Sequence, residues 1–206
     1  MVVMEVPHTS LPADEDEALA GLEELFWTLD LGPRHRVELL EGQIVVSPKP
    51  AFWHELVVTW LIVRFESACK ARGWQQAPGA DLVLSPSRDI IQPDFLVVRD
   101  PSAFSNVESV VPVEHVLLVA EICSPSSLRA DREVKPLGCA KAGIPFYLLV
   151  DRFTQPMTIS LMSEPGEQGY RKAETVHAGR DGGKLHVPEP FGITIDAATV
   201  PEARPA

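Results

Sequence analysis

Residues 116–122 read Val116-Leu117-Leu118-Val119-Ala120-Glu121-Ile122 and are almost continuously apolar. This pattern is typical of a strand in a sheet that is covered on both faces, because a face in water would show alternating polar residues. A second apolar run, at residues 144–151, follows a predicted helix near residues 136–142. Strand, helix and strand in this order indicate an α/β domain.

The segments on either side extend this core. Apolar residues at helical spacing predict a helix over residues 52–72 that Gly73 ends, and another over residues 19–31. Strand-like runs separated by Gly, Pro and Ser lie at residues 36–46 (two short strands about a Glu-Gly turn), 81–84, 90–98, 157–162, 170–176, 184–187 and 192–196. We therefore predict an α/β (α+β) fold with a mixed central β-sheet, flanking helices and C-terminal β-hairpins.

A chain of 206 residues and 22.6 kDa is long enough to bury one well-formed core. We expect an acidic N-terminal lead-in at residues 1–20, a single domain at residues 21–196 and a C-terminal tail at residues 197–206. No repeat with a period of 20–50 residues recurs, which argues against a solenoid.

The net charge of −11 is unevenly distributed. By itself it argues against a protein that coats nucleic acid through Lys and Arg. However, residues 1–33 contain eight acids and no Lys or Arg, and the other 173 residues contain 21 acids and 18 bases. The charge therefore leaves DNA binding possible, but predicts that it is weak and local.

The three cysteines, Cys69, Cys123 and Cys139, form no C-x-x-C pair. An odd number without this spacing favours a reducing compartment over a disulfide framework or a cysteine zinc site. The chain begins without the pattern of a secretory signal, and no apolar run approaches the ~18 residues of a membrane span. We expect a cytoplasmic protein with no membrane partner.

Two acids lie within predicted buried strands. Asp94 follows Ile90, Ile91 and Pro93, and Glu121 ends an apolar run. An isolated ionised carboxylate in apolar surroundings is strongly unfavourable, and a divalent cation is one natural compensation. The alternative is structural: Asp94 at a bulge or a strand edge, and Glu121 at a strand end that meets solvent, a helix N-terminus or an Arg.

Six segments together resemble the Uma-two family of predicted restriction endonucleases, a branch of the PD-(D/E)XK nuclease superfamily (DUF820). They occur in the family's order and spacing from about Arg36 to Asp151, and residues 190–195 resemble its closing strand. The matching segments are residues 37–48, His54, residues 92–94, 121–126, 131–135 and 142–151.

The resemblance implies a restriction-endonuclease-like core and assigns roles within it. Asp94 and Glu121 would bind Mg²⁺ or Mn²⁺ and support hydrolysis of DNA by an activated water. The superfamily's lysine normally stands two residues after the second acid, where this chain has Cys123. Lys135 would supply the ammonium instead, to orient or deprotonate the water or to offset charge on the phosphate.

Four further residues are candidates for supporting roles. The family generally has an acid where this chain has Gln43, which can hydrogen-bond a metal-bound water but supplies no charge. Glu38 and Glu41 are alternatives, although strand alternation places them on opposite faces. His54 could assist at the start of its helix, but the pattern favours a polar residue that neighbours a helix cap.

The second hypothesis is a catalytically degenerate nuclease fold that serves as a binding or assembly module, because fold alone does not establish function. Gln43 and Cys123 motivate it, as does Pro136, which predicts that the helix begins close to Lys135 and shifts its amine. A third is that residues 1–33 mimic DNA and block the protein's own cleft. A homodimer is plausible, since most oligomers have two-fold symmetry.

Overall fold

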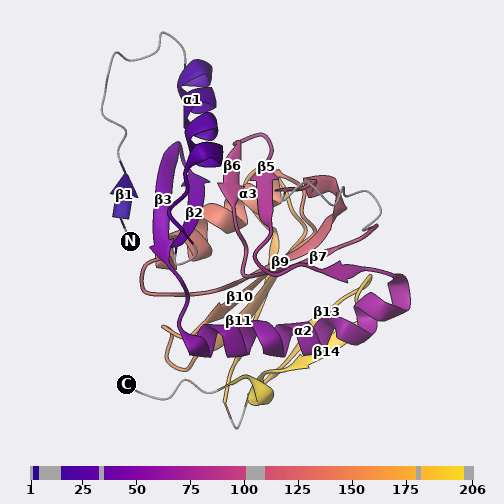
Figure 1. Cartoon of the computed structure of the whole chain (residues 1–206). Helices are drawn as coiled ribbons and strands as arrows, with labels where there is room; N and C mark the ends of the chain where they lie inside the picture. Colours follow the sequence, from indigo (N-terminus) through magenta and orange to yellow (C-terminus); the bar gives the residue numbers. More distant parts are fainter. Residues whose placement is uncertain (1, 5–14, 33–34, 101–109, 180–181, 202–206) are drawn as a thin grey trace.

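The computed structural model describes residues 2–4, 15–32, 35–100, 110–179 and 182–201. Figure 1 shows how the helices and strands are arranged in space. The helical elements are α1 (Glu15–Thr28), α2 (Phe52–Arg72), η2 (Val113–His115), η3 (Ala130–Val134), α3 (Lys135–Lys141) and η4 (Ala197–Thr199). The strands are β1 (Val2–Met4), β2 (His35–Leu40), β3 (Gln43–Pro48), β4 (Gln75–Gln76), β5 (Asp81–Leu84), β6 (Asp89–Ile91), β7 (Phe95–Val98), β8 (Val110–Val111), β9 (Val116–Ile122), β10 (Phe146–Asp151), β11 (Thr158–Ser163), β12 (Lys172–His177), β13 (Lys184–Val187) and β14 (Ile193–Asp196).

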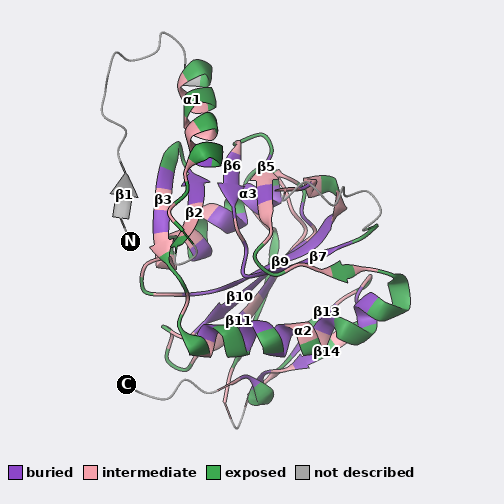
Figure 2. Ribbon diagram, viewed as in Figure 1, coloured by how far each residue is buried: buried purple, intermediate pink, exposed green. Residues whose placement is uncertain are grey.

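The central sheet has the strand order β12-β11-β10-β9-β7-β4. Strands β9 and β10 are parallel, with Leu118 opposite Phe146 and Glu121 opposite Leu149, and the other pairs are antiparallel. Both β9 and β10 are buried along their whole length (Figure 2). This confirms the predicted mixed sheet, with its apolar central strands.

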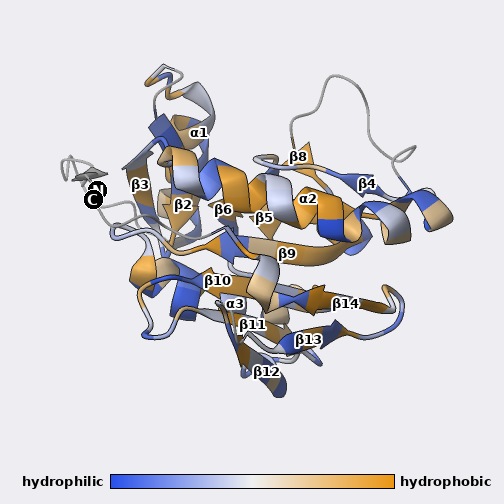
Figure 3. Ribbon diagram, turned by 90° about the horizontal axis from the view of Figure 1, so that it is seen from below, coloured by the Kyte–Doolittle hydropathy of each residue, from blue (hydrophilic) through white to orange (hydrophobic). Residues whose placement is uncertain are grey.

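The two faces of this sheet are covered by different helices. Leu118, Ala120 and Ile122 of β9 point toward α2, which lies along that face (Figure 3). Val119 and Cys123 point the other way, into a cluster that includes Cys139 of α3. Because side chains alternate along a strand, Glu121 belongs to the α3 side.

A second sheet has the order β1-β3-β2-β6-β5-β8, and a small third sheet pairs β13 with β14. Helix α1 packs its apolar residues on Leu39 and Ile44 of the second sheet. Strands β2 and β3 are joined through Glu41 (φ 50°) and Gly42 (φ 70°), a two-residue hairpin turn with both backbones left-handed. Alternation along β2 therefore directs Arg36 and Glu38 away from α1 and toward the central sheet.

The single strand predicted over residues 90–98 is wrong. Strand β6 pairs with β2 and β5 in the second sheet, and β7 pairs with β4 and β9 in the central sheet. The chain crosses between the sheets through Gln92, Pro93 and Asp94. Proline has no N–H for a sheet ladder, so the pairing is interrupted at this point.

Helix α3 begins at Lys135, as the position of Pro136 predicted, but the helical backbone starts earlier in the chain. Helical backbone is already present at Leu128, and a π-helical turn, η3, leads directly into α3. Within it the Lys135 N–H bonds the Ala130 carbonyl five residues earlier. Pro136 offers no N–H to the next carbonyl, that of Asp131, and the Tyr147 hydroxyl donates to it instead at 2.8 Å.

The ends of the predicted domain are partly described. Helix α1 spans residue 20, while residues 1 and 5–14 of the acidic lead-in lie outside the described residues, so the proposed blocking role of that segment stays a prediction. Ala197 and Val200 are buried against the α2 side of the sheet. In the part of the chain that the structure describes, no helix has the length and apolar character of a membrane span.

Candidate active site

Asp94 lies at the crossing between β6 and β7, and its carboxylate is almost fully enclosed. Arg36 Nη2 lies 2.5 Å from its Oδ1. Its Oδ2 receives the Ile122 backbone N–H at 2.7 Å and lies 2.9 Å from His54 Nε2. Strand β2, helix α2 and strand β9 thus all contribute one partner to this carboxylate.

Lys135 is the centre of a second, deeper group. Its Nζ lies 2.8 Å from Glu121 Oε1, 2.9 Å from Glu38 Oε1 and 3.2 Å from Asp131 Oδ1. Lys135 and Glu121 are 1% and 0% exposed. A buried ammonium needs such partners, because removing a charge from water without compensation is very costly.

The local helix geometry positions Lys135. The wide turn of η3 allows Asp131 and Lys135, four residues apart, to face the same interior point. Ser127 donates a very short hydrogen bond to Asp131 Oδ2, and Ser127 in turn contacts Ser124 at 2.8 Å. The serine turn before the helix is therefore linked through Asp131 to the ammonium.

Burial and neighbouring charges shift the pKa values of Asp94 and Glu121 in opposite directions. Burial alone would raise the pKa of Asp94, but Arg36 and His54 hold it well below its usual range. Glu121 differs, since burial raises its pKa well above the usual range despite Lys135, and neighbouring carboxylates add to the shift. Burial opposes ionisation of Lys135, but Glu121, Glu38 and Asp131 together raise its pKa. Lys135 therefore stays charged, and Asp94 stays ionised.

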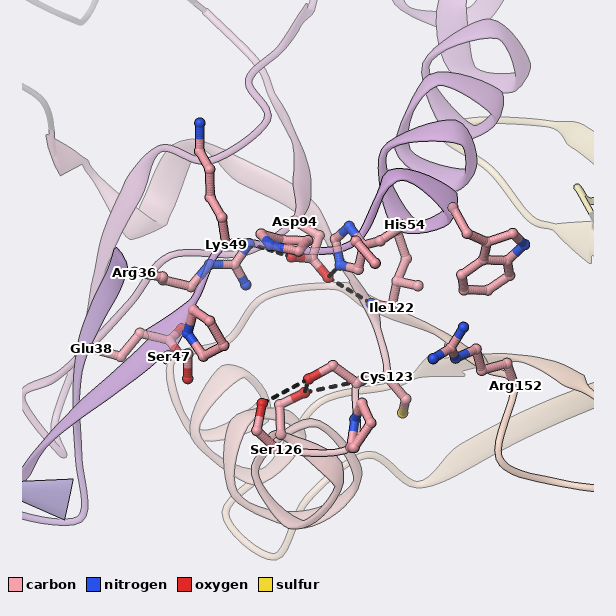
Figure 4. Close-up of a pocket in the computed structure, with 17 residues that line it drawn as sticks. Arg36, Glu38, Ser47, Lys49, His54, Asp94, Ile122, Cys123, Ser126 and Arg152 are labelled. Carbon is pink, nitrogen blue, oxygen red and sulfur yellow. Dashed lines mark hydrogen bonds and ion pairs between the residues drawn. The ribbon is translucent and has the colours of Figure 1, made fainter. Parts of the chain in front are cut away.

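A pocket of about 170 Å³ opens beside Asp94 (Figure 4). Arg36, Lys49 and Ser47 lie along one side of it, and Cys123, Ser126 and Arg152 along the other. The full lining is Arg36, Glu38, Ser47, Pro48, Lys49, Pro50, Ala51, Trp53, His54, Asp94, Ile122, Cys123, Ser124, Pro125, Ser126, Ser127 and Arg152. Glu121 and Lys135 do not line this pocket, and they pair with each other on the α3 side of the sheet.

The structure brings together only some of the supporting candidates. Glu38 joins the Lys135 group, and it also accepts the Gln92 N–H at 3.0 Å. His54 lies in the first turn of α2, after the N-cap residue Ala51, and its ring contacts Asp94. Glu41 and Gln43 are exposed at the β2–β3 turn, and Glu41 pairs there with Arg129 at 2.7 Å.

Sequence reasoning missed two members of the site, Arg36 and Asp131. Arg36 stands two residues before Glu38, so strand alternation places both on one face and could have revealed it. Asp131 stands four residues before Lys135, a spacing that brings side chains together on one side of a helix. Cys123, at the position of the usual lysine, is buried, and burial raises the pKa of its thiol.

The donor set fits a hard divalent cation. Glu38, Asp94, Glu121 and Asp131 face only two permanent cations, Arg36 and Lys135. The buried Glu121 Oε2 accepts no hydrogen bond. No group of three or more His, Cys, Asp or Glu forms a ready metal cage among the described residues. Mg²⁺, however, is usually bound through one or two carboxylates with water and substrate oxygens.

Comparison with known proteins identifies the family and the fold of this chain. The family model Uma2, described as "Putative restriction endonuclease", matches residues 22–198. A search of curated proteins found no match. Among solved structures, a putative nuclease belonging to DUF820 from Anabaena variabilis ATCC 29413 aligns with a TM-score of 0.64 and 18% sequence identity. The alignment covers 86% of this chain and 95% of that one, which shows a shared fold.

Proposed function

The chain belongs to the Uma2 family, and we propose that it is a metal-dependent endonuclease that hydrolyses DNA phosphodiester bonds. One observation carries the proposal: Lys135 Nζ lies within 2.9 Å of both Glu38 and Glu121, beside the Asp94 crossing. Three segments that are distant in the sequence converge there. Four carboxylates around two cations in the interior carry a high desolvation cost, and this favours a functional role for the cluster.

Asp94 and Glu121 would hold Mg²⁺ or Mn²⁺, with Glu38 as a third oxygen donor close by. The bound ion would supply Lewis-acid stabilisation and a water of lowered pKa. Asp94 suits this role because Arg36 and His54 keep it ionised. Glu121 suits it because its Oε2 is buried without a partner, so a cation would satisfy that atom.

Lys135 would act through its charge. The surrounding carboxylates raise its pKa, so it cannot accept a proton near neutral pH. This favours charge stabilisation over deprotonation of water, the two tasks that the family resemblance left open. Arg36 lines the pocket and pairs with Asp94, and its guanidinium could also contact a phosphate oxygen there.

The test is nicking of supercoiled plasmid with Mg²⁺ or Mn²⁺ by wild type, Asp94→Ala and Glu121→Ala. We expect each substitution to reduce the rate at least ~100-fold, as loss of a transition-state stabilising group does. Glu174→Ala, which removes an exposed carboxylate of β12, is the matched control and should keep full activity. Equal nicking by wild type and both site variants would contradict the proposal.

A second candidate is a binding or assembly module. It is favoured by the complete set of protein partners on Asp94, which accepts from Arg36 and Ile122 and contacts His54. Such a carboxylate is satisfied without metal. Titration calorimetry separates the two: binding of Mn²⁺ that is lost in Asp94→Ala supports the nuclease, and no heat of binding supports the module.

A further inference from the structure

We infer that the pocket beside Asp94 receives an unpaired nucleotide of a single strand, and that Arg152 with its neighbouring aromatic rings stacks on the base. The inference rests on the proposed function, because it concerns the strand that the same site would cleave. It goes beyond that function in naming the form of the nucleic acid and the residues that select it.

The position of the carboxylates limits which strand can reach them. Asp94, which is 4% exposed, lines a pocket of about 170 Å³, and Glu121, which is 0% exposed, does not reach its wall. This is smaller than the usual ~300–1,000 Å³ of a ligand site. Part of one nucleotide fits such a space. An unpaired strand can turn a phosphate inward, because its bases are free to leave the stack, whereas a duplex holds its backbone on a regular helix.

The charge of the pocket suits a phosphate. Lys49 and Arg152 line it, and the other charged residues of the lining have partners: Arg36 pairs with Asp94, and Glu38 pairs with Lys135. Hydroxyl groups of Ser47, Ser124 and Ser126 add donors that require no charge. In a chain with a net charge of −11, this is a local cationic patch rather than an extended track. Such a patch holds a few phosphates, while duplex binding draws on many.

Aromatic rings beside the patch indicate contact with bases. The Arg152 guanidinium carbon lies 5.1 Å from the Trp53 ring centroid and 4.9 Å from that of Phe153. Phe153 is 38% exposed, and Phe52, which precedes Trp53 in α2, is 77% exposed. Stacking on aromatic and arginine planes is the usual way to bind unpaired bases, because a duplex already stacks its bases on one another.

The experiment is fluorescence anisotropy with a short oligothymidylate and with a hairpin duplex of the same length, in EDTA at low salt. We expect wild type to bind the single strand at least ~10-fold more tightly. Arg152→Ala and Phe153→Ala should each weaken that binding by about fivefold or more, as removal of a stacking partner does. Arg152→Lys keeps the positive charge but loses the planar guanidinium. Its affinity for the single strand should therefore lie between those of Arg152→Ala and wild type.

Arg64→Ala is the matched control, since Arg64 lies 5.3 Å from the Trp60 ring in the same arrangement but outside the pocket. The affinity of Arg64→Ala for the single strand should equal that of wild type. Equal or tighter binding of the duplex would overturn the inference, as would full recovery in Arg152→Lys. Cleavage assays separate the two proposals: faster metal-dependent cleavage of duplex than of single strand sinks only this inference. Single-strand binding that depends on Arg152, without cleavage of any DNA, sinks only the proposed function.

Discussion

The two faces of β9 differ although their residues alternate along one strand. Toward α2, Leu118, Ala120 and Ile122 join an entirely apolar cluster that includes Phe65 and Phe95. Toward α3, Glu121 lies one position away from Ala120 and meets a buried ammonium. Both sides are closed to solvent, so exposure does not distinguish them.

The difference shows how the fold separates stability from chemistry. The α2 face gains free energy mainly from burial of apolar area, and no ionised group belongs to its cluster. The α3 face carries carboxylates whose desolvation must be offset by Lys135, an arrangement that gives little net stability. A sheet of this kind can keep an ionic cluster in place because its other face supplies the folding free energy.

The largest effect should come from removing the cation of the α3 face. We expect Lys135→Met to lower the free energy of unfolding by about 3–5 kcal/mol, because three carboxylates lose their buried partner. Urea denaturation measures this. The double variant Lys135→Met with Glu121→Gln should regain part of the loss, since the amide carries no charge. A single variant as stable as wild type would show that the cluster is not ionic.

A change on the α2 face should affect stability alone. Phe65 packs against Phe191 and Phe95, with ring centroids 5.2 Å and 5.6 Å away. Phe65→Leu should lower the free energy of unfolding by about 1–2 kcal/mol through lost ring contacts. Plasmid nicking per folded molecule should stay at the wild-type rate. A loss of nicking larger than the loss of folded protein would mean that the two faces are not independent.

On the α3 face, the Tyr147 hydroxyl replaces the backbone donor that Pro136 lacks. Its hydroxyl satisfies the Asp131 carbonyl that Pro136 leaves without an N–H. Tyr147→Phe should cost about 1 kcal/mol, because the carbonyl remains buried and unpaired. Adding Pro136→Ala restores a backbone donor and should recover stability in thermal unfolding. Further destabilisation in that double variant would count against this account of the π-helical turn.

The smallest effect is expected at Asp81 of β5 in the second sheet, whose carboxylate accepts from the Gln92 side chain at 3.1 Å. Burial raises its pKa above the usual 3.8, so the folded state binds the proton more tightly than the unfolded state. The stability that protonation of Asp81 gives the folded wild type is therefore present at low pH and is lost as pH rises above about 4. Asp81→Asn should be more stable by about 0.5 kcal/mol at pH 7 and equal at pH 3. A constant difference across this range would exclude titration of Asp81.

Most elements were predictable because their signals are local. The helix at residues 52–72 has the predicted bounds, and the strands around Glu41-Gly42 follow from turn chemistry. Asp94 and Glu121 stood out as acids in apolar runs. Residues 19–31 were displaced by a few positions relative to α1, since helix ends depend on weak terminal contacts.

The sequence by itself determined where most strands and helices lie, and which carboxylates have no local reason to be buried. Only the tertiary structure decided that β6 and β7 belong to different sheets, since strand pairing depends on partners far away in the chain. It also decided that Arg36 meets Asp94, 58 positions away, and that Lys135 lies among Glu38, Glu121 and Asp131. A π-helical turn and a tyrosine from the neighbouring strand allow this, and neither leaves a pattern in the residues around Lys135.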